Sequence, residues 1–347
     1  MKVLFNCNNT VFQHPGGGEI LLLKTMEYLK KEGITIKLFD HWNDKIVDYD
    51  ILHNFGKSSN CYDLIRLSKM HNLPIVLTPL YNWPSVKYGI REHYSFPQKI
   101  KGVGYTLLKR HFSFVSKSKK ILSLSDMITP DSMIEGRLLQ KDFGISLRKV
   151  FPVPCGVDEK FYGAKPDEFY DKYKLENFIL YVGRIDPRKN LLDLIKIMNK
   201  INIPLVLIGA KNQEYLTYYE NCLKIANKNI HFIDHMDHDS SMLKSAYASA
   251  KVLVLPSWLE APGLVALEAG LAGTNIVITN RGTTTEYFKD YAWYVNPLDK
   301  RDIESKIRDA YNTERNKELS KHIKENFIWP KVIAKLKEGY RKVLISS

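Results

Sequence analysis

Short apolar runs alternate with longer amphipathic stretches along the first half of the chain. Runs rich in β-branched and aliphatic residues predict strands at residues 3–5, 34–39, 51–53 and 74–78, and a 3.6-residue period predicts a helix at 20–31. Strands that alternate with helices in this way are typical of βαβ units, which form parallel sheets.

The second half of the chain repeats this pattern. Strands are predicted at residues 178–182, 205–208, 230–233, 252–255 and 275–278, with helices at 191–200 and 264–271 between them. Between the halves, residues 151–158 hold two prolines and a glycine, which suit a domain boundary better than a helix or strand. We therefore expect an α/β protein with two doubly wound, Rossmann-like domains facing each other across a cleft, residues 1–152 and 153–330. Ligands of such sheets bind beyond the carboxyl ends of the strands.

Composition indicates the kind of partner and the cellular compartment to expect. The 347 residues are 44% hydrophobic and carry a formal net charge of +13, which favours acidic partners such as phosphates, nucleic acid or anionic lipid. The four cysteines are far apart and form no CxxC pair, so a zinc site and a disulfide framework are not expected. No signal-peptide pattern and no apolar run of roughly 20 residues is visible. We expect a cytoplasmic chain, soluble or peripheral to a membrane.

A glycine run follows the first predicted strand, in the sequence His-Pro-Gly-Gly-Gly-Glu of residues 14–19. Glycines let backbone N–H groups approach a ligand closely, and the helix that follows adds partial positive charge at its start. A tight strand-to-helix turn explains the same residues equally well. The run fits neither GxGxxG nor a P-loop.

Two cations follow the first strand of the second half. Arg184 comes directly after Gly183 at the end of that predicted strand, and Lys189 precedes the next helix. A guanidinium and an ammonium at this edge of a sheet suit phosphate oxygens. The alternative is a solvated basic loop, of which Arg188 is the best candidate member.

Two glutamates bracket the start of the helix predicted at residues 264–271. Pro262 and Gly263 suit a helix start, so Glu260 should lie in the entry loop and Glu268 about one turn inside the helix. The N–H groups of residues 263–265 could then point at a diphosphate, with one carboxylate near a sugar and the other near a ribose. The alternative for Glu268 is an exposed helix charge, which its apolar neighbours make less convincing.

These motifs together resemble the "group 1" family of retaining glycosyltransferases with the GT-B fold. The glycine run with Glu19, the pair Arg184 and Lys189, and the E-x7-E spacing of Glu260 and Glu268 occur in the order typical of that family. The Gly-Val-Asp at 156–158 is similar to the family's domain junction. The C-terminal segment, residues 331–347, resembles a helix that returns to the N-terminal domain.

The resemblance implies a sugar transferase that uses a nucleotide-sugar, UDP- or GDP-linked, and needs no metal or other cofactor. Arg184 and Lys189 would bind and stabilise the leaving diphosphate, Glu260 would contact the donor sugar, and Glu268 the ribose. Further donor-binding residues would be Gly17, Gly18, Gly183, Gly263, Leu264 and Val265. The implied acceptor is a glycan or a lipid-linked glycan in cell-surface polysaccharide synthesis. Preorganised cations in a dry site can replace a metal ion at a leaving diphosphate, and no side-chain nucleophile is evident, so we expect front-face attack by the acceptor.

The sequence departs from the family pattern at two places. Ala261 and Pro262 stand where the family often has Gly-Phe, which changes the expected shape of the sugar pocket. After the strand at 74–78 the family usually has a histidine that contacts the donor sugar; here either Tyr81 or Asn82 replaces it, or no residue does. His93, the next histidine, is expected at the surface.

Two groups of residues imitate metal sites. Asp48 and Asp50 form a DxD string that we interpret as a solvated turn. A second group combines three histidines and three aspartates in one loop: His231, Asp234, His235, Asp237, His238 and Asp239. We interpret this group as a surface loop beside the nucleotide base rather than a metal site.

A basic, aromatic segment lies at residues 87–120, where nine cations face a single acid, Glu92. Its apolar residues fall near helical spacing, so it suits an interfacial helix on an anionic membrane surface, or equally a core-packing helix with a solvated basic face. The same charge leaves a nucleic-acid-binding protein, or a sugar transferase acting on DNA, as alternative functions. No helix-turn-helix, zinc-finger, RRM or KH signature supports nucleic-acid binding.

Overall fold

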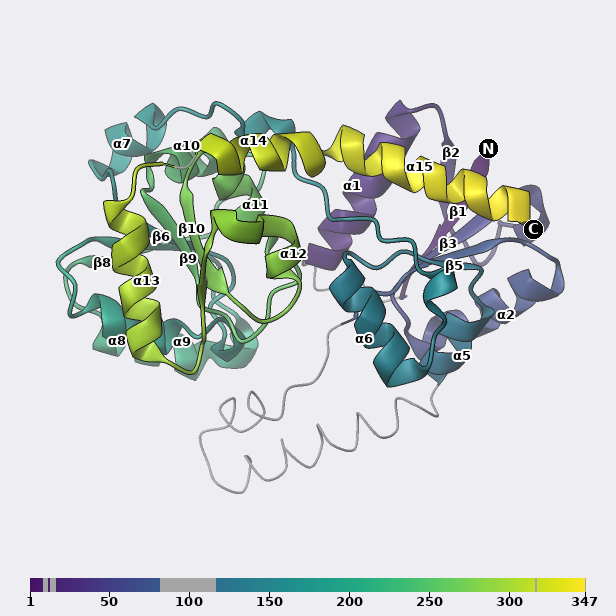
Figure 1. The fold of residues 1–347 in the computed structure, drawn as a ribbon, viewed down its shortest axis with the longest axis horizontal. Helices are drawn as coiled ribbons and strands as arrows, with labels where there is room; N and C mark the ends of the chain where they lie inside the picture. The colour runs from purple at the N-terminus through teal and green to yellow at the C-terminus, as the bar shows by residue number, and fades with distance from the viewer. Residues whose placement is uncertain (9–11, 13–16, 82–116, 316, 347) are drawn as a thin grey trace, which may run out of the picture. The chain divides into compact units, whose positions relative to one another are not determined.

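The computed structural model describes residues 1–8, 12, 17–81, 117–315 and 317–346. The chain divides into two compact units (Figure 1). Unit 1 comprises Met1–Gly156 and Trp329–Ser347, and unit 2 comprises Val157–Ile328. The division falls four residues after the expected boundary at 152, and the return to unit 1 begins two residues before the expected residue 331.

Unit 1 is a five-stranded parallel sheet covered by helices. Its strand order is β2-β1-β3-β4-β5. The strands are β1 (Lys2–Asn6), β2 (Thr35–Leu38), β3 (Ile51–Phe55), β4 (Ile75–Thr78) and β5 (Met127–Ile128). The helices are α1 (Gly17–Lys31), α2 (Tyr62–Met70), α5 (Lys117–Leu124), α6 (Met133–Phe143) and α15 (Trp329–Ser346).

Both faces of this sheet are buried, because successive side chains of a strand point to opposite faces. Val3 and Phe5 of β1 join a core with α1 and α15, whereas Leu4 joins a second core with α2, α5 and α6. The C-terminal helix α15, yellow in Figure 1, lies beside the purple α1 although more than 290 residues separate their starts in the sequence. Burial on both faces explains the apolar runs of β1 and β4.

His53 connects α15 to the sheet of unit 1. It is 1% exposed, its Nδ1 lies 2.6 Å from the Tyr340 hydroxyl of α15, and its Nε2 lies 2.8 Å from the Thr78 hydroxyl of β4. Burial lowers the pKa of His53 to about 3, because desolvation disfavours the charged imidazolium. The ring therefore stays neutral in the folded chain and serves as a hydrogen-bonded link.

This buried histidine predicts an acid-sensitive unit 1. Between pH 6.5 and 3 the unfolded chain binds a proton at His53 that the folded chain does not. Lowering the pH through this range therefore lowers the free energy of unfolding, by up to about 1.4 kcal/mol per pH unit. Urea unfolding of the wild type and of His53→Gln, which cannot titrate, tests this. We expect a shallower pH dependence for the variant in this window; equal slopes would contradict the assignment.

Unit 2 is a six-stranded parallel sheet with the order β11-β10-β9-β6-β7-β8. Its strands are β6 (Ile179–Val182), β7 (Leu205–Ile208), β8 (Ile230–Ile233), β9 (Val252–Leu255), β10 (Asn275–Thr279) and β11 (Trp293–Val295). Its helices are α7 (Asp167–Tyr173), α8 (Leu191–Met198), α9 (Leu216–Ile225), α10 (Ser241–Ser249), α11 (Leu264–Leu271), α12 (Thr284–Phe288), α13 (Lys300–Asn312) and α14 (Lys317–Asn326). Two doubly wound parallel sheets confirm the expected α/β fold class.

Each sheet has one point at which the strand order reverses. In unit 2 the chain runs outward from β6 to β7 and β8, then returns to the other side of β6 as β9. In unit 1 the corresponding reversal lies between β1 and β3. At such points the loops after neighbouring strands diverge and leave a crevice, which is where open α/β sheets bind ligands.

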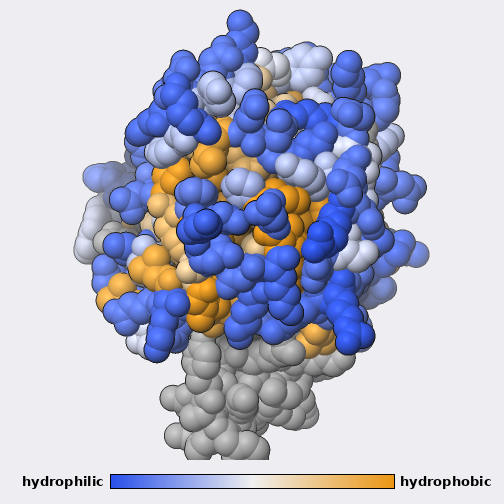
Figure 2. Space-filling view, turned by 90° about the vertical axis from the view of Figure 1, so that its left-hand side faces the viewer, coloured by the Kyte–Doolittle hydropathy of each residue, from blue (hydrophilic) through white to orange (hydrophobic). Residues whose placement is uncertain are grey.

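The face of the molecule drawn in Figure 2 is largely hydrophilic. Figure 2 shows one face of the molecule, on which charged and polar side chains surround smaller apolar patches. Among the described helices, none is long and apolar enough to span a bilayer. Most of the basic segment at 87–120 lies outside the described residues; only its last four residues, at the start of α5, are described.

Candidate active site

The loops after β6 and β9 meet at the strand reversal of unit 2, and they bring together two residues singled out by the sequence. Lys189 Nζ lies 2.6 Å from Glu260 Oε1. Both side chains are largely buried, at 14% and 8% exposure. The two loops are also joined through their backbones, since the Trp258 N–H donates to the Arg188 carbonyl. A charged pair so little exposed to water interacts more strongly than a surface pair.

Arg184 follows the same strand and is half-exposed. Its Nε lies 3.9 Å from Asp186 Oδ2, and the Asp186 side chain is 6% exposed. Gly183, directly before it, has a φ of +146° and approaches the backbone of the β7 loop so closely that a Cβ on Gly209 would lie 1.9 Å from the Gly183 carbonyl. The Tyr181 hydroxyl donates to the Arg184 carbonyl at 2.8 Å, which fixes the backbone of the arginine.

Glu260 is held by its own backbone. Its N–H donates to the Arg281 carbonyl, and its carbonyl accepts from the Thr283 N–H. Gly282 lies between these partners with a φ of +108°, and a Cβ there would lie 1.8 Å from the Glu260 carbonyl oxygen. The loop after β10 thus depends on this glycine to fix the position of Glu260.

Helix α11 begins beside Glu260. Gly263 is its N-cap with a φ of +91°, and the first intrahelical bonds run from the Ala266 and Leu267 N–H groups to the Gly263 carbonyl. The N–H groups of Leu264 and Val265 precede those bonds, so they have no acceptor one turn back. Half-buried at a helix N-terminus, they are suited to an anion.

Glu268 lies one turn further along α11 and is 6% exposed, so it is not a helix-surface charge. Its Oε2 accepts from the Tyr247 hydroxyl of α10 at 2.6 Å, and its Oε1 is 2.9 Å from His238 Nε2. The hydrogen bond to Glu268 raises the pKa of His238. Neither partner of Glu268 was identified from the sequence.

Two further residues support the loops and were also missed. The side-chain amide of Asn190 donates to the carbonyls of Pro256 and Pro297, both at 3.2 Å, and ties the loops after β6, β9 and β11 together. Arg281 lies over the Trp258 ring at 5.7 Å. The only sequence signal for Asn190 is its position next to Lys189.

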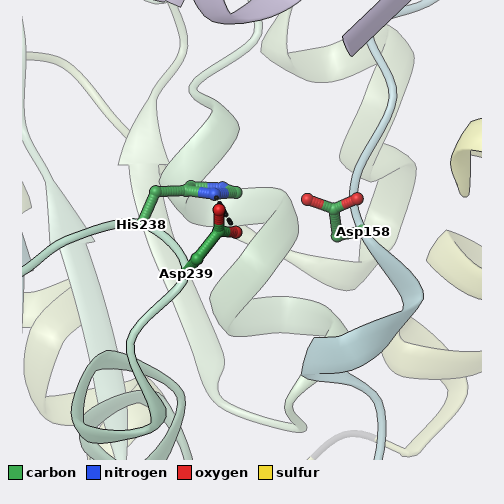
Figure 3. A group of neighbouring side chains, drawn as sticks. All are labelled: Asp158, His238 and Asp239. Carbon is green, nitrogen blue, oxygen red and sulfur yellow. Dashed lines mark hydrogen bonds and ion pairs between the residues drawn. The ribbon is translucent and has the colours of Figure 1, made fainter. Parts of the chain in front are cut away.

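A group of possible metal ligands lies near Glu268 (Figure 3). Asp158 from the domain junction points toward His238 and Asp239, and the candidate ligand atoms of the three lie within 4.8 Å of one another. The ammonium of Lys160 already contacts all three: Nζ is 3.6 Å from Asp158 Oδ2, 3.4 Å from His238 Nδ1 and paired with Asp239. A side-chain cation therefore lies among these ligands.

The other histidines and aspartates of the loop do not join the group. Asp48 and Asp50 are exposed, as expected for a solvated turn.

The remaining predicted donor residues lie in unit 1. Gly17 and Gly18 open α1, and a Cβ on Gly18 would be 3.4 Å from Leu80. Gly16 and Asn82, as well as His93, lie outside the described residues. Tyr81 is 6% exposed and points into the core, where its hydroxyl donates to Asp142 at 2.8 Å. This contact disfavours Tyr81 as the replacement for the family's histidine, which leaves Asn82 or no residue in that role.

A cavity of about 460 Å³ lies at the strand reversal of unit 1. The ends of β1 and β3, the start of α1 and the loop after β4 line it. Its polar lining residues are Asn8, Lys57, Ser58, Ser59 and Ser118. Lys57 Nζ lies 4.8 Å from the centre of the Tyr81 ring, so Tyr81 packs against a residue that lines this cavity.

Comparison with known proteins finds a family match for the C-terminal unit. The family model "Glycosyl transferases group 1" matches residues 165–328, which is nearly all of unit 2. The O-antigen chain mannosyltransferase RfbU of Salmonella typhimurium is 24% identical over 69% of this chain and 62% of its own length. The first alignments with curated relatives span between 30% and 73% of those relatives.

Solved structures match the whole chain. Sucrose-phosphate synthase from Thermosynechococcus elongatus superposes with a TM-score of 0.80 at 19% identity and 100% coverage of both chains. Anabaena HepE in complex with UDP and glucose gives a TM-score of 0.71 at 14% identity, over 99% of this chain and 100% of HepE. The chain thus has the GT-B fold of these solved structures, and its residues 165–328 match the family Glycosyl transferases group 1.

Proposed function

We propose that this chain is a glycosyltransferase that moves a hexose from a UDP- or GDP-linked sugar to a glycan or lipid-linked acceptor, with retention of anomeric configuration and without a metal ion. The observation that carries the proposal is the buried contact between Lys189 and Glu260 at the strand reversal of unit 2. This contact pairs the ammonium of Lys189, which would bind phosphate, with the carboxylate of Glu260, which would bind the donor sugar. HepE, which has the same fold, was solved with UDP and glucose.

The charges of the site suit a departing diphosphate. An ammonium has three donors, so Lys189 can keep one hydrogen bond to Glu260 and give two to phosphate oxygens. Arg184 adds a half-exposed guanidinium, which binds phosphate oxygens in a planar, two-pronged geometry. The Leu264 and Val265 N–H groups complete the set of donors. Fixed cations of this kind stabilise the charge that develops as the diphosphate leaves, as a metal does elsewhere.

The reaction that fits these residues breaks the bond between the anomeric carbon and the diphosphate oxygen. The acceptor hydroxyl oxygen then bonds to the same face of that carbon, and its proton passes to the leaving phosphate oxygen. Glu260, held on Lys189, would contact hydroxyls of the donor sugar, and Glu268 those of the ribose. Such differential stabilisation of the departing group is what lowers the barrier.

We place the acceptor in the cavity of unit 1, at the second strand reversal. Its hydroxyls and amide suit the hydroxyl groups of a sugar, and Lys57 suits an acidic group on the acceptor. The relation to an O-antigen mannosyltransferase supports a role in cell-surface polysaccharide synthesis. A lipid-linked acceptor would bring the chain to the cytoplasmic face of a membrane, where the basic segment at 87–120 would contact anionic lipid.

A thermal-shift series tests the donor proposal. UDP, GDP, ADP and their common sugars are added singly, with and without EDTA. At 100 times its dissociation constant, the correct nucleotide should stabilise the chain by about 2.7 kcal/mol. We expect a uracil or guanine nucleotide to do this equally well in EDTA. Stabilisation by none of them would contradict the donor, and stabilisation lost in EDTA would contradict metal independence.

A further inference from the structure

The carboxylate of Glu268 is oriented on two sides before any ligand arrives. Tyr247, fully buried, donates to Oε2, and His238 donates to Oε1. A carboxylate has about four acceptor sites, so these bonds leave roughly two. One further hydrogen bond can then reach each oxygen of the carboxylate, and a ribose offers two neighbouring hydroxyls that can donate them.

Both nitrogens of the His238 ring have partners, which fix the orientation of the ring. A carboxylate oxygen only accepts, so Nε2 must carry the hydrogen that reaches Glu268. The other ring nitrogen, Nδ1, lies 3.3 Å from Asp239 Oδ1 and 3.4 Å from Lys160 Nζ. The edge of the ring also meets Phe161, with 5.6 Å between ring centres.

Lys160 is itself fixed by two carboxylates, Asp158 from the domain junction and Asp239 from the loop of His238. The contacts thus form a chain from the junction through Lys160 and His238 to Glu268. The expected donor chemistry does not require Lys160 or His238 to contact the nucleotide. Their contacts instead fix the position of Glu268, which is expected to contact the ribose.

We propose that His238 is a positioning residue that determines ribose recognition: it holds Glu268 so that the free acceptor sites of the carboxylate face the 2′ and 3′ hydroxyls of the donor nucleotide. Lys160 and Asp239 support this role by contacting the other ring nitrogen, Nδ1, which keeps the ring in place. This inference rests on the proposed function, because it assumes that a nucleotide binds beside α11.

The test compares a ribonucleotide with its deoxy counterpart. The nucleoside diphosphate that stabilises the wild type most, and its 2′,3′-dideoxy form, are titrated calorimetrically into wild type, His238→Ala and His238→Gln. Two hydrogen bonds to a carboxylate should give the wild type a preference for the ribonucleotide of about 10–100-fold. His238→Ala should reduce that preference to about threefold or less by weakening ribonucleotide binding alone. His238→Gln, whose amide can donate from a similar position, should keep part of it.

His71→Ala is the matched control, since His71 is an exposed histidine of unit 1 and belongs to no predicted site. Its preference should equal that of the wild type. An unchanged preference in His238→Ala, or an equal loss of affinity for both ligands, would overturn the role of His238 alone. A wild type that binds no nucleoside diphosphate would overturn the proposed function and this inference with it.

Discussion

Replacing Arg184 by alanine is expected to lower kcat about 10²–10³-fold while the chain remains folded. The side chain is 52% exposed and its nearest carboxylate oxygen is 3.9 Å from Nε, so little stability depends on it. The loss follows because one fixed positive charge no longer meets the departing diphosphate. Release of nucleoside diphosphate from the nucleotide-sugar, followed over time, measures the rate.

Arg301→Ala provides the control for this variant. Arg301 is an exposed arginine in the first turn of α13, in the same unit, so its removal changes the net charge equally. We expect wild-type turnover from it. If Arg184→Ala were as active as Arg301→Ala, the guanidinium would have no part in the reaction.

The second large effect concerns the pair Lys189 and Glu260 and separates stability from chemistry. Lys189→Met should destabilise the chain by about 3–5 kcal/mol, because it leaves the buried Glu260 carboxylate without its partner. The double variant Lys189→Met with Glu260→Gln should recover most of that stability, since both charges are then gone. Turnover should stay lost in both, because neither can stabilise the diphosphate.

Urea unfolding and nucleoside diphosphate release, measured on the same preparations, complete this comparison. Glu260→Gln alone should lose less stability than Lys189→Met, since an amide oxygen can still accept from the ammonium. Recovery of turnover together with stability in the double variant would mean that the pair only supports the fold.

The fold was largely predictable because buried parallel strands are apolar throughout. The runs at 205–208, 230–233 and 252–255 coincide with β7, β8 and β9. The sequence missed β5 and β11, which have two and three residues and are too short to show a pattern. The strand order, and therefore the point of reversal, is set by packing between distant segments and is not visible in a local pattern.

The site was predictable where strand ends define it. Lys189 and Glu260 are 71 residues apart, but each follows a central strand, and parallel strands bring their carboxyl ends to one edge. Contacts between side chains were not predictable. His238 reaches Glu268 from a loop, and Tyr81 turns toward Asp142 because a buried hydroxyl needs a partner. Such choices depend on three-dimensional neighbours that residue types do not reveal.

A crystal structure of the chain with its preferred nucleoside diphosphate, grown with manganese present, tests the central claim most directly. The account predicts Lys189 Nζ and the Arg184 guanidinium within hydrogen-bonding distance of phosphate oxygens, with Nζ still on Glu260 and no metal between protein and ligand. Phosphates bridged by manganese, or these two side chains turned away from them, would contradict it.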